Sequence, residues 1–469
     1  MLRIFRHHLS APALLLFVLE NAVFTAVFFW LTRAGLMAAA GMPVGLPEIF
    51  HSSIIYALAI LVSVILWSIG AYDKGHLDDV RRVAGRLIVA FFIAYPLALG
   101  LLYFNGVNAK ATLFFLPACC AVGLVVGLFG ILIGRLAVMR VADVAMLKRR
   151  VLVLGVGERA AKIALFIEQS SDRSLEIVGY LRAANEEAMI DPGLIVAQAD
   201  ELNDITRRLN VEEIVVAVGD RRGVPVQPLL SCRLGGITII DYLTFWERET
   251  GQVMLDALDP SWLIYSDGFR VGRRLNSAVK RLLDLVVSAV FALFLGPLML
   301  VVALMVKIDS PGPVFYAQER VGRQGRVFTL YKFRSMRQDA EKNGISQWAA
   351  TDDPRITRIG SFLRKTRIDE IPQVLNVLRG DMSFIGPRPE RPFFVESLSK
   401  EIRYYNERAR VRPGITGWAQ INYPYGASVE DAKEKLSYDF YYIKNYSLML
   451  DLLVLMATVQ VIFFPKGVR

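Results

Sequence analysis

The hydrophobic positions of this chain form long apolar runs near its N-terminus and shorter, alternating runs further along. Four of the long runs are of sufficient length to cross a bilayer, which takes roughly 20 helical residues. They cover residues 11–32, 52–72, 87–104 and 111–134. The pattern predicts a four-helix transmembrane domain within residues 1–140.

The Lys and Arg residues between these runs predict the orientation of the helices. The N-terminus, the loop between the second and third runs and the segment after the fourth are basic, with Arg3, Arg6, Lys74, Arg81, Arg82, Arg86, Arg135, Arg140, Lys148, Arg149 and Arg150. The two alternate loops hold only Arg33 and Lys110. By the positive-inside rule, both ends of the bundle should lie in the cytoplasm.

Residues 145–270 change to short apolar runs separated by helix-like stretches. RVLVLGVG, LEIVGYL, EIVVAV and GITIID are strand-like, and their alternation with helices predicts a Rossmann-like α/β domain with a parallel sheet. Gly155-x-Gly157-x-x-Ala160 fits a dinucleotide-binding turn, but Arg182 stands where an acidic residue would bind the ribose. Gly155 and Gly157 are therefore candidate nucleotide contacts, and the alternative is a structural or regulatory domain.

A fifth apolar run, Leu285 to Val306, has basic sequence on both sides, RRLNSAVKR before it and ERVGRQGR after it. Both flanks should therefore remain on the cytoplasmic face. Gly296 and Pro297 lie in the middle of the run, and proline removes a backbone donor and bends a helix. We expect a re-entrant helix over residues 282–308 with its kink at Pro297, and the alternative is a straight span.

Composition narrows the chemistry that the chain can perform. Hydrophobic residues make up 54% of the 469 residues, and the net charge of +10 suits an anionic partner. No histidine lies beyond His76, which excludes Ser-His-Asp and Cys-His catalysis from the C-terminal half. Cys119 and Cys120 are neighbours and Cys232 is alone, so neither a disulfide framework nor a metal-type spacing is present. Carboxylates, Lys and Arg therefore remain as the candidate catalytic groups of the C-terminal half.

Two adjacent carboxylates, Asp369 and Glu370, form the centre of the candidate site, in TRIDEIPQVLNVLRGDMSFIGPRPE. A helix start before Pro372 would by itself explain acidic residues there, because the helix dipole stabilises them. The cations nearby favour a site for a substrate with several phosphate charges. They include Lys332, Arg334, Arg364 and Arg388. Carboxylates together with phosphate oxygens are the usual surroundings of Mg²⁺.

Four longer stretches of the sequence resemble the motifs of one known protein family. They are KRLLDL, SPGPVFYAQERVGRQGRVFTLYKFRSM, DDPRITRIGSFLRKTRIDEIPQVLNVLRGDMSFIGPRPE and RPGITGWAQIN. Together they resemble the bacterial polyprenyl-phosphate sugar-1-phosphate transferases, the monotopic phosphoglycosyl transferases of exopolysaccharide, capsule and O-antigen biosynthesis, in their long form. They span most of residues 275–469, for which the resemblance implies a mixed, mainly helical catalytic domain on the membrane surface. Arg367 departs from the family pattern, in which a small residue often stands there.

The resemblance implies transfer of sugar-1-phosphate from a UDP-sugar to undecaprenyl phosphate, with release of UMP. Asp369 would attack the β-phosphate and form a covalent aspartyl-phosphosugar. Glu370 would assist through Mg²⁺ or in proton handling, and the two carboxylates are the implied metal ligands. Arg388 would hold a substrate phosphate, and the further candidates for phosphate binding are Lys332, Arg334, Arg364 and Arg412.

The implied setting is the bacterial inner membrane, with membrane lipid as a partner, the α/β and catalytic domains on the cytoplasmic side, and a homodimer as the assembly. Glucose and galactose are the favoured sugars. Nucleic acid is not an expected partner, because the positive charge follows the membrane topology and the phosphate site. The alternatives are a non-catalytic, membrane-tethered nucleotide-binding regulator of polysaccharide synthesis and a processive glycosyltransferase. The second would release UDP rather than UMP, and no D-x-D motif lies near the cations.

Overall fold

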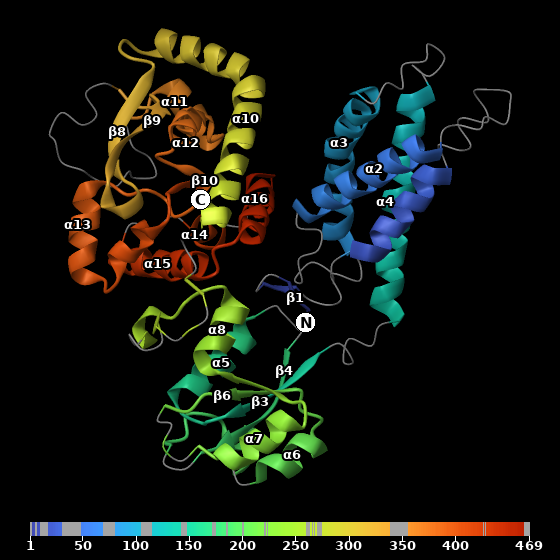
Figure 1. Cartoon of the computed structure of the whole chain (residues 1–469), viewed down its shortest axis with the longest axis vertical. Coiled ribbons are helices and arrows are strands. Elements are labelled where there is room, and N and C mark those ends of the chain that lie inside the picture. The colour runs from blue at the N-terminus through green and yellow to red at the C-terminus, as the bar shows by residue number, and fades with distance from the viewer. Residues whose placement is uncertain are drawn as a thin grey trace. The chain divides into compact units, whose positions relative to one another are not determined.

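The computed structural model of the chain consists of two compact units, Met1–Glu249 and Thr250–Arg469 (Figure 1). The residues that it describes are 2–4, 7–9, 17–30, 48–68, 80–104, 115–141, 148–170, 175–183, 186–198, 201–219, 222, 224–258, 263–264, 266, 268–269, 274–337, 355–424, 426 and 428–463. Helices predominate, and a parallel sheet forms the centre of an α/β domain in the first unit.

The N-terminal part of the first unit is helical where apolar runs are predicted. After a short antiparallel pair of strands, β1 (Leu2–Ile4) and β2 (His7–Leu9), come helices at residues 17–30, α2 (Glu48–Ser68), α3 (Val80–Phe104) and α4 (Phe115–Val141). The loops that hold Arg33 and Lys110 lie outside the described residues, as do parts of the predicted spans.

Among the described residues, one helix is long and apolar enough to cross a membrane, Ser277–Asp309. Shorter apolar helices occupy the positions of the four predicted spans: Phe17–Trp30, Tyr56–Ser68, Gly85–Leu101 and Cys120–Leu136. A multi-pass arrangement in the membrane therefore remains a prediction.

A buried ion pair joins the first helix to α4. Nε of Arg135 donates to Oε1 of Glu20 at 2.7 Å and Nη2 donates to Oε2 at 3.1 Å. Both side chains are buried, and the bidentate geometry gives each charge a partner where water is absent. At Gly127 a Cβ would lie 2.3 Å from the ring of Phe24, so the absence of a side chain allows the two helices to approach closely.

The α/β domain confirms the predicted alternation of strands and helices. Its five-stranded sheet has the order β5-β4-β3-β6-β7, and all neighbouring strands are parallel. The strands are β3 (Arg149–Leu154), β4 (Leu175–Arg182), β5 (Ile195–Gln198), β6 (Glu213–Val216) and β7 (Thr238–Asp241); the helices are α5 (Glu158–Gln169), α6 (Leu202–Arg208), α7 (Val226–Leu234) and α8 (Tyr242–Thr250). The order reverses next to β3, which is where doubly wound folds place a ligand.

The second unit is built on one long helix, α10 (Arg274–Asp309), and an antiparallel hairpin of β8 (Phe315–Val321) and β9 (Val327–Phe333). Short elements follow: α11 (Arg358–Lys365), the 3₁₀ helix η8 (Ile368–Gln373), α12 (Val374–Arg379), β10 (Ser383–Ile385), α13 (Pro392–Glu401), the 3₁₀ helix η9 (Tyr405–Arg410), β11 (Gly414–Thr416), α14 (Trp418–Asn422), α15 (Val429–Lys444) and α16 (Leu448–Phe463). The strands β10 and β11 pair in parallel.

Helix α10 combines a buried face with a broad exposed apolar surface. Val302 and Val306 pack against Phe333 of the hairpin and Leu363 of α11. Leu293, Phe294 and Leu300 are each about three-quarters exposed (73–75%), which is unusual for apolar side chains facing water. Figure 1 shows that the yellow ribbon of α10 bends before it reaches β8. Pro297 lies inside this helix, as the sequence indicates.

Residues 250–258 belong to the second unit and pack against its helices. Trp418 donates its indole N–H to the carbonyl of Gly251 at 2.8 Å, and the amide of Val253 donates to the carbonyl of Ser437 at 3.1 Å. Val253 and Leu258 are buried in a cluster with residues of α13 and α15. This segment is therefore part of the framework around the candidate site.

Candidate active site

The hairpin and the short helix η8 bring the two carboxylates and a lysine together. Arg367, with a φ of 59°, adopts the left-handed conformation that ends α11 and begins η8. The turn places Asp369 and Glu370 in a 3₁₀ helix, where successive side chains are about 120° apart. Both are buried, with exposed fractions of 6% and 7%. Lys332 reaches them from β9.

Glu370 is held by two cations. Its Oε1 accepts hydrogen bonds from Nζ of Lys332 at 2.7 Å and from Nη2 of Arg388 at 2.9 Å. Burial by itself would raise the pKa of Glu370, but the nearby charges of Arg388 and Lys332 outweigh it and hold the pKa well below its usual range. Glu370 is therefore a permanent carboxylate that fixes the two cations.

Asp369 differs from its neighbour Glu370 in its contacts and in the direction of its pKa shift. Within the part of the chain that the structure describes, its carboxylate forms no hydrogen bond or ion pair. Burial raises the pKa of Asp369, Lys332 opposes this, and the negative charge of Glu370 adds to the increase. A buried, unpaired carboxylate beside fixed cations is more basic and less solvated than one in water, which suits a nucleophile.

Asn376, which sequence reasoning did not single out, fastens α12 to the hairpin. Its side chain is fully buried; Oδ1 accepts from the amide of Tyr331 at 3.1 Å and Nδ2 donates to the carbonyl of Thr329 at 2.7 Å. These bonds fix β9 next to α12, which directly follows η8, and so help to position Lys332. A polar residue within the apolar repeat of QVLNVL is the signal that could have identified it.

The remaining predicted cations lie in different places. Arg364 donates from Nε to Oγ of Ser335 at 3.0 Å. Its positive charge is among those that oppose the burial-induced rise in the pKa of Asp369. Arg334 is turned towards the end of α10, where Nη2 donates to the carbonyl and hydroxyl of Ser310 at 2.6 and 2.9 Å. The structure thus groups Lys332, Arg364 and Arg388 with the carboxylates.

Arg412 follows η9, and its backbone lies against Gly386, next to the Pro-Arg-Pro turn. A Cβ at Gly386 would be 2.3 Å from the carbonyl oxygen of Arg412. Burial raises the pKa of Tyr446, and the Arg412 charge counteracts that shift. Arg412 therefore supports the turn through its backbone, while its charge acts near Tyr446.

Comparison with known proteins decides the family. The model of the family described as "Bacterial sugar transferase" matches residues 275–465, which include both carboxylates and all the cations above. A Bacillus subtilis protein named "Putative undecaprenyl-phosphate N-acetylgalactosaminyl 1-phosphate transferase" is 50% identical over 149 residues, which are 31% of this chain and 83% of that protein. This chain belongs to the bacterial sugar transferase family.

Longer relatives extend the similarity beyond the sugar transferase region. An Aeromonas hydrophila protein named "UDP-N-acetylgalactosamine-undecaprenyl-phosphate N-acetylgalactosaminephosphotransferase" is 43% identical over 51% of this chain and 56% of its own length. A Xanthomonas campestris protein named "UDP-glucose:undecaprenyl-phosphate glucose-1-phosphate transferase" is 34% identical over 66% of each chain. The matches to these two relatives thus span between about half and two-thirds of each of them.

Magnesium binding by Asp369 and Glu370 in this sugar transferase region stays a prediction. Among the described residues, no group of three or more His, Cys, Asp or Glu side chains is arranged around one point. Mg²⁺ is commonly held by one or two carboxylates plus substrate phosphates. Asp369 has no hydrogen-bond or ion-pair partner among the described residues, so its carboxylate is the better candidate ligand, whereas Oε1 of Glu370 already accepts two bonds from cations.

The predicted nucleotide turn of the α/β domain is occupied by a side chain of the same chain. Gly155 has a φ of +128°, which favours glycine, and Gly157 precedes α5. The carboxylate of Glu186 accepts from the amide of Val156 at 2.9 Å and from the amide of Gly219 at 3.0 Å. Glu186 therefore places a negative charge at the turn and takes the amide of Val156, a backbone donor that a nucleotide phosphate could otherwise use. Nucleotide binding at Gly155 and Gly157 remains a prediction.

Proposed function

We propose that this protein transfers sugar-1-phosphate from a UDP-sugar to undecaprenyl phosphate, with release of UMP, as the first membrane step of exopolysaccharide, capsule or O-antigen synthesis. The proposal rests on two adjacent buried carboxylates. Asp369 has no hydrogen bond or ion pair among the described residues, and its neighbour Glu370 binds two cations. The names of the Aeromonas and Xanthomonas relatives describe this class of reaction.

The proposed reaction has two steps. Asp369 forms a bond from a carboxylate oxygen to the β-phosphorus of the UDP-sugar, and the bond from that phosphorus to the bridging oxygen breaks, so UMP leaves. A phosphate oxygen of undecaprenyl phosphate then attacks the same phosphorus and releases the aspartate. No proton has to be removed from either nucleophile, because both are anions, which agrees with the absence of histidine beyond His76.

The cations supply the charge neutralisation that phosphoryl transfer needs. The transition state spreads negative charge over the phosphoryl oxygens, so positioning and electrostatics matter more than a strong base. Arg388, which is fixed by Glu370, holds a substrate phosphate, and Lys332 keeps the local potential positive beside Asp369. Mg²⁺, when bound with substrate at Asp369, supplies further neutralisation of the diphosphate.

The setting of the reaction is the cytoplasmic face of the bacterial inner membrane. The exposed apolar surface of α10 lies in the bilayer, and the bend near Pro297 returns the helix to the same face. The four N-terminal helices span the membrane, and the assembly is a homodimer. This placement brings a water-soluble UDP-sugar and a lipid-linked phosphate to one site at the headgroup level.

The test is a product assay with the full-length protein in detergent. UDP-glucose, UDP-galactose and their N-acetylated counterparts are each incubated with undecaprenyl phosphate and Mg²⁺, and released UMP is measured. We expect UMP from at least one sugar and none from the Asp369→Asn variant. Release of UDP would instead indicate glycosidic bond formation, and UMP release by Asp369→Asn at the wild-type rate would contradict the covalent aspartate.

A further inference from the structure

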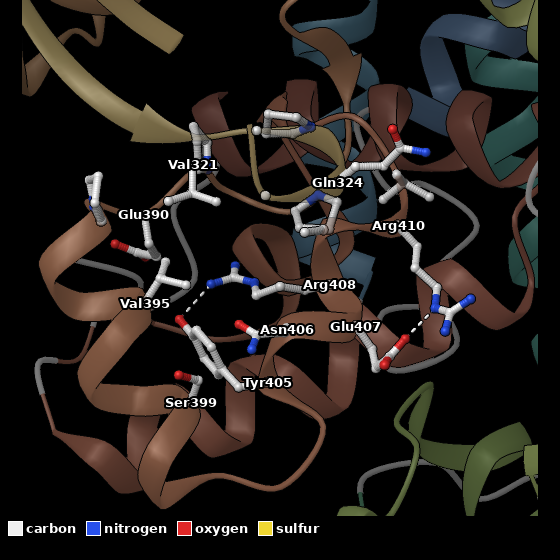
Figure 2. Close-up of a pocket in the computed structure, with 18 of the residues that line it drawn as sticks. Val321, Gln324, Glu390, Val395, Ser399, Tyr405, Asn406, Glu407, Arg408 and Arg410 are labelled. Atoms are coloured by element: carbon white, nitrogen blue, oxygen red, sulfur yellow. Dashed lines mark hydrogen bonds and ion pairs between the residues drawn. The ribbon is translucent and has the colours of Figure 1, made fainter. Parts of the chain in front are cut away.

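A pocket of about 570 Å³ lies beside the Pro-Arg-Pro turn, and neither Asp369 nor Glu370 lines it. Its walls come from the turn between β8 and β9, from residues 387–390, from α13 and from η9 (Figure 2). Arg388 is shared between the pocket and the carboxylates, because it lines the pocket and also donates to Glu370. A molecule held by Arg388 therefore has this pocket next to it.

The chemistry of a UDP-sugar determines which of its parts lies there. The β-phosphate carries the bond that breaks and is joined through one oxygen to the sugar ring. If Arg388 holds that phosphate, the sugar lies within a few ångströms of the Arg388 guanidinium. The nucleoside is separated from the β-phosphate by the α-phosphate and the ribose, so it is much further away.

The lining suits a sugar better than a uracil ring. The lining combines valines and prolines with polar side chains, including Gln324, Asn406, Ser399 and Glu390 (Figure 2). A sugar ring matches such a mixed lining, because it has apolar C–H faces as well as hydroxyl groups. Sugar hydroxyls need such paired donors and acceptors. The single aromatic residue among the described lining residues is Tyr405, which is 3% exposed and so presents no open ring face to a base.

The floor of the pocket is rigid and is tied to Arg388. The guanidinium of Arg408 donates to the hydroxyl of Tyr405 at 2.7 Å and to the carbonyl of Arg388 at 3.0 Å. It also pairs with the buried Asp439 of α15 at 2.8 Å. Arg408 is thus a positioning residue that keeps the pocket and the Pro-Arg-Pro turn in one fixed arrangement, as a preorganised site requires.

We propose that this pocket is the subsite for the sugar of the UDP-sugar, and that Asn406 and Gln324 contact its hydroxyl groups. The inference rests on the proposed function, since it uses Arg388 as the phosphate contact. It assigns the selection of the sugar to the β8–β9 turn and η9, which lie apart from the reacting carboxylates in the sequence.

The test compares Asn406→Ala and Gln324→Asn with wild type. Asparagine is chosen at position 324 because Gln324 has a φ of 57°, a conformation that Asn tolerates. Values of kcat/KM are measured for UDP-glucose, UDP-galactose, UDP-N-acetylglucosamine and UDP-N-acetylgalactosamine, together with inhibition by UMP. Glu401→Ala serves as the control, because Glu401 is exposed at the end of α13 and does not line the pocket.

We expect a loss of about 3- to 10-fold in kcat/KM for the best sugar, the effect of one neutral hydrogen bond. The ratio between sugars should change, with UMP inhibition unaltered. Equal losses for all four sugars with weaker UMP inhibition would place the nucleotide in the pocket and overturn the inference. Wild-type selectivity in both variants would overturn it and leave the proposed function standing. A wild type that releases no UMP from any sugar would overturn both.

Discussion

Lys332 on β9 and Glu370 on η8 form a partly buried ion pair with 2.7 Å between Nζ and Oε1. The pair fixes one of the two adjacent carboxylates and leaves Asp369, the other, without a partner among the described residues. Two neighbouring acids of similar burial thus have opposite electrostatic environments. Pairs of titratable groups whose surroundings push their pKa values apart are typical of catalytic sites, and the first predictions follow from this asymmetry.

Removing the charge of Asp369 and of Glu370 should change stability in opposite directions. Asp369→Asn relieves a buried, unpaired charge, so its unfolding midpoint at pH 7.5 should exceed that of wild type. Glu370→Gln removes the charged acceptor of the hydrogen bonds from Lys332 and Arg388 and should destabilise the protein by about 1.5–3 kcal/mol. Thermal unfolding of both variants in the same detergent measures this. A lower midpoint for Asp369→Asn at pH 7.5 would contradict the assignment.

The stability difference between Asp369→Asn and wild type should also depend on pH. The pKa of Asp369 is raised by burial, so the destabilising charge is fully present above the folded-state pKa and disappears as pH falls through it. The advantage of Asp369→Asn should therefore shrink on acidification. The pKa of Glu370 is depressed, so its contribution is present above the unfolded value and is lost only as pH falls below that value. Unfolding midpoints from pH 8 to pH 5 should show a shrinking advantage for Asp369→Asn and a constant deficit for Glu370→Gln.

Replacing Lys332 should shift the acid limb of the activity profile. Asp369 reacts as a carboxylate, so activity should fall as pH decreases through its raised pKa. Lys332 lowers that pKa, and Lys332→Gln should move the acid limb of kcat/KM to higher pH, in addition to lowering the maximum. Lys400→Gln, which removes an exposed charge on α13, should leave the limb in place. An acid limb that is unchanged in Lys332→Gln would show that Asp369 does not control it.

The contact between Gly386 and Arg412 predicts that a single methyl group disrupts the site. A Cβ at Gly386 would lie 2.3 Å from the carbonyl oxygen of Arg412, so Gly386→Ala should displace the turn that carries Arg388 and abolish most UMP release. Gly100→Ala is the matched control, because nothing lies within 4 Å of a Cβ there either. Full activity in Gly386→Ala would show that this contact is dispensable.

In the α/β domain, Glu186 should compete with nucleotide phosphates for the turn after β3. We expect that NAD⁺ does not raise the unfolding midpoint of the wild-type protein. Glu186→Ala removes the acceptor of two backbone donors, at Val156 and Gly219, and should destabilise the protein by about 1–3 kcal/mol. Stabilisation of wild type by NAD⁺ would show that Glu186 leaves the turn, and would favour a nucleotide-binding role for Gly155 and Gly157.

The sequence by itself determined the elements that depend on local pattern. The α/β domain followed from strand-like runs separated by helical stretches, because the spacing of apolar side chains reflects which face of each element is buried. The long apolar helix with an internal proline and the carboxylates Asp369 and Glu370 were visible in the same way. The resemblance to the family rested on motifs that are contiguous in the chain.

Only the tertiary structure decided which side chains meet. Lys332 and Glu370 are 38 positions apart, and no local rule states that Lys332 faces the carboxylate while its near neighbour Arg334 turns to the end of α10. The same holds for Glu186, which reaches the glycine turn from another loop, for Asn376, which bonds to β9, and for Arg408, which pairs with Asp439 of α15. Ion pairs and hydrogen bonds of this kind depend on the register in which the elements pack, which is set by the whole fold rather than by any one segment.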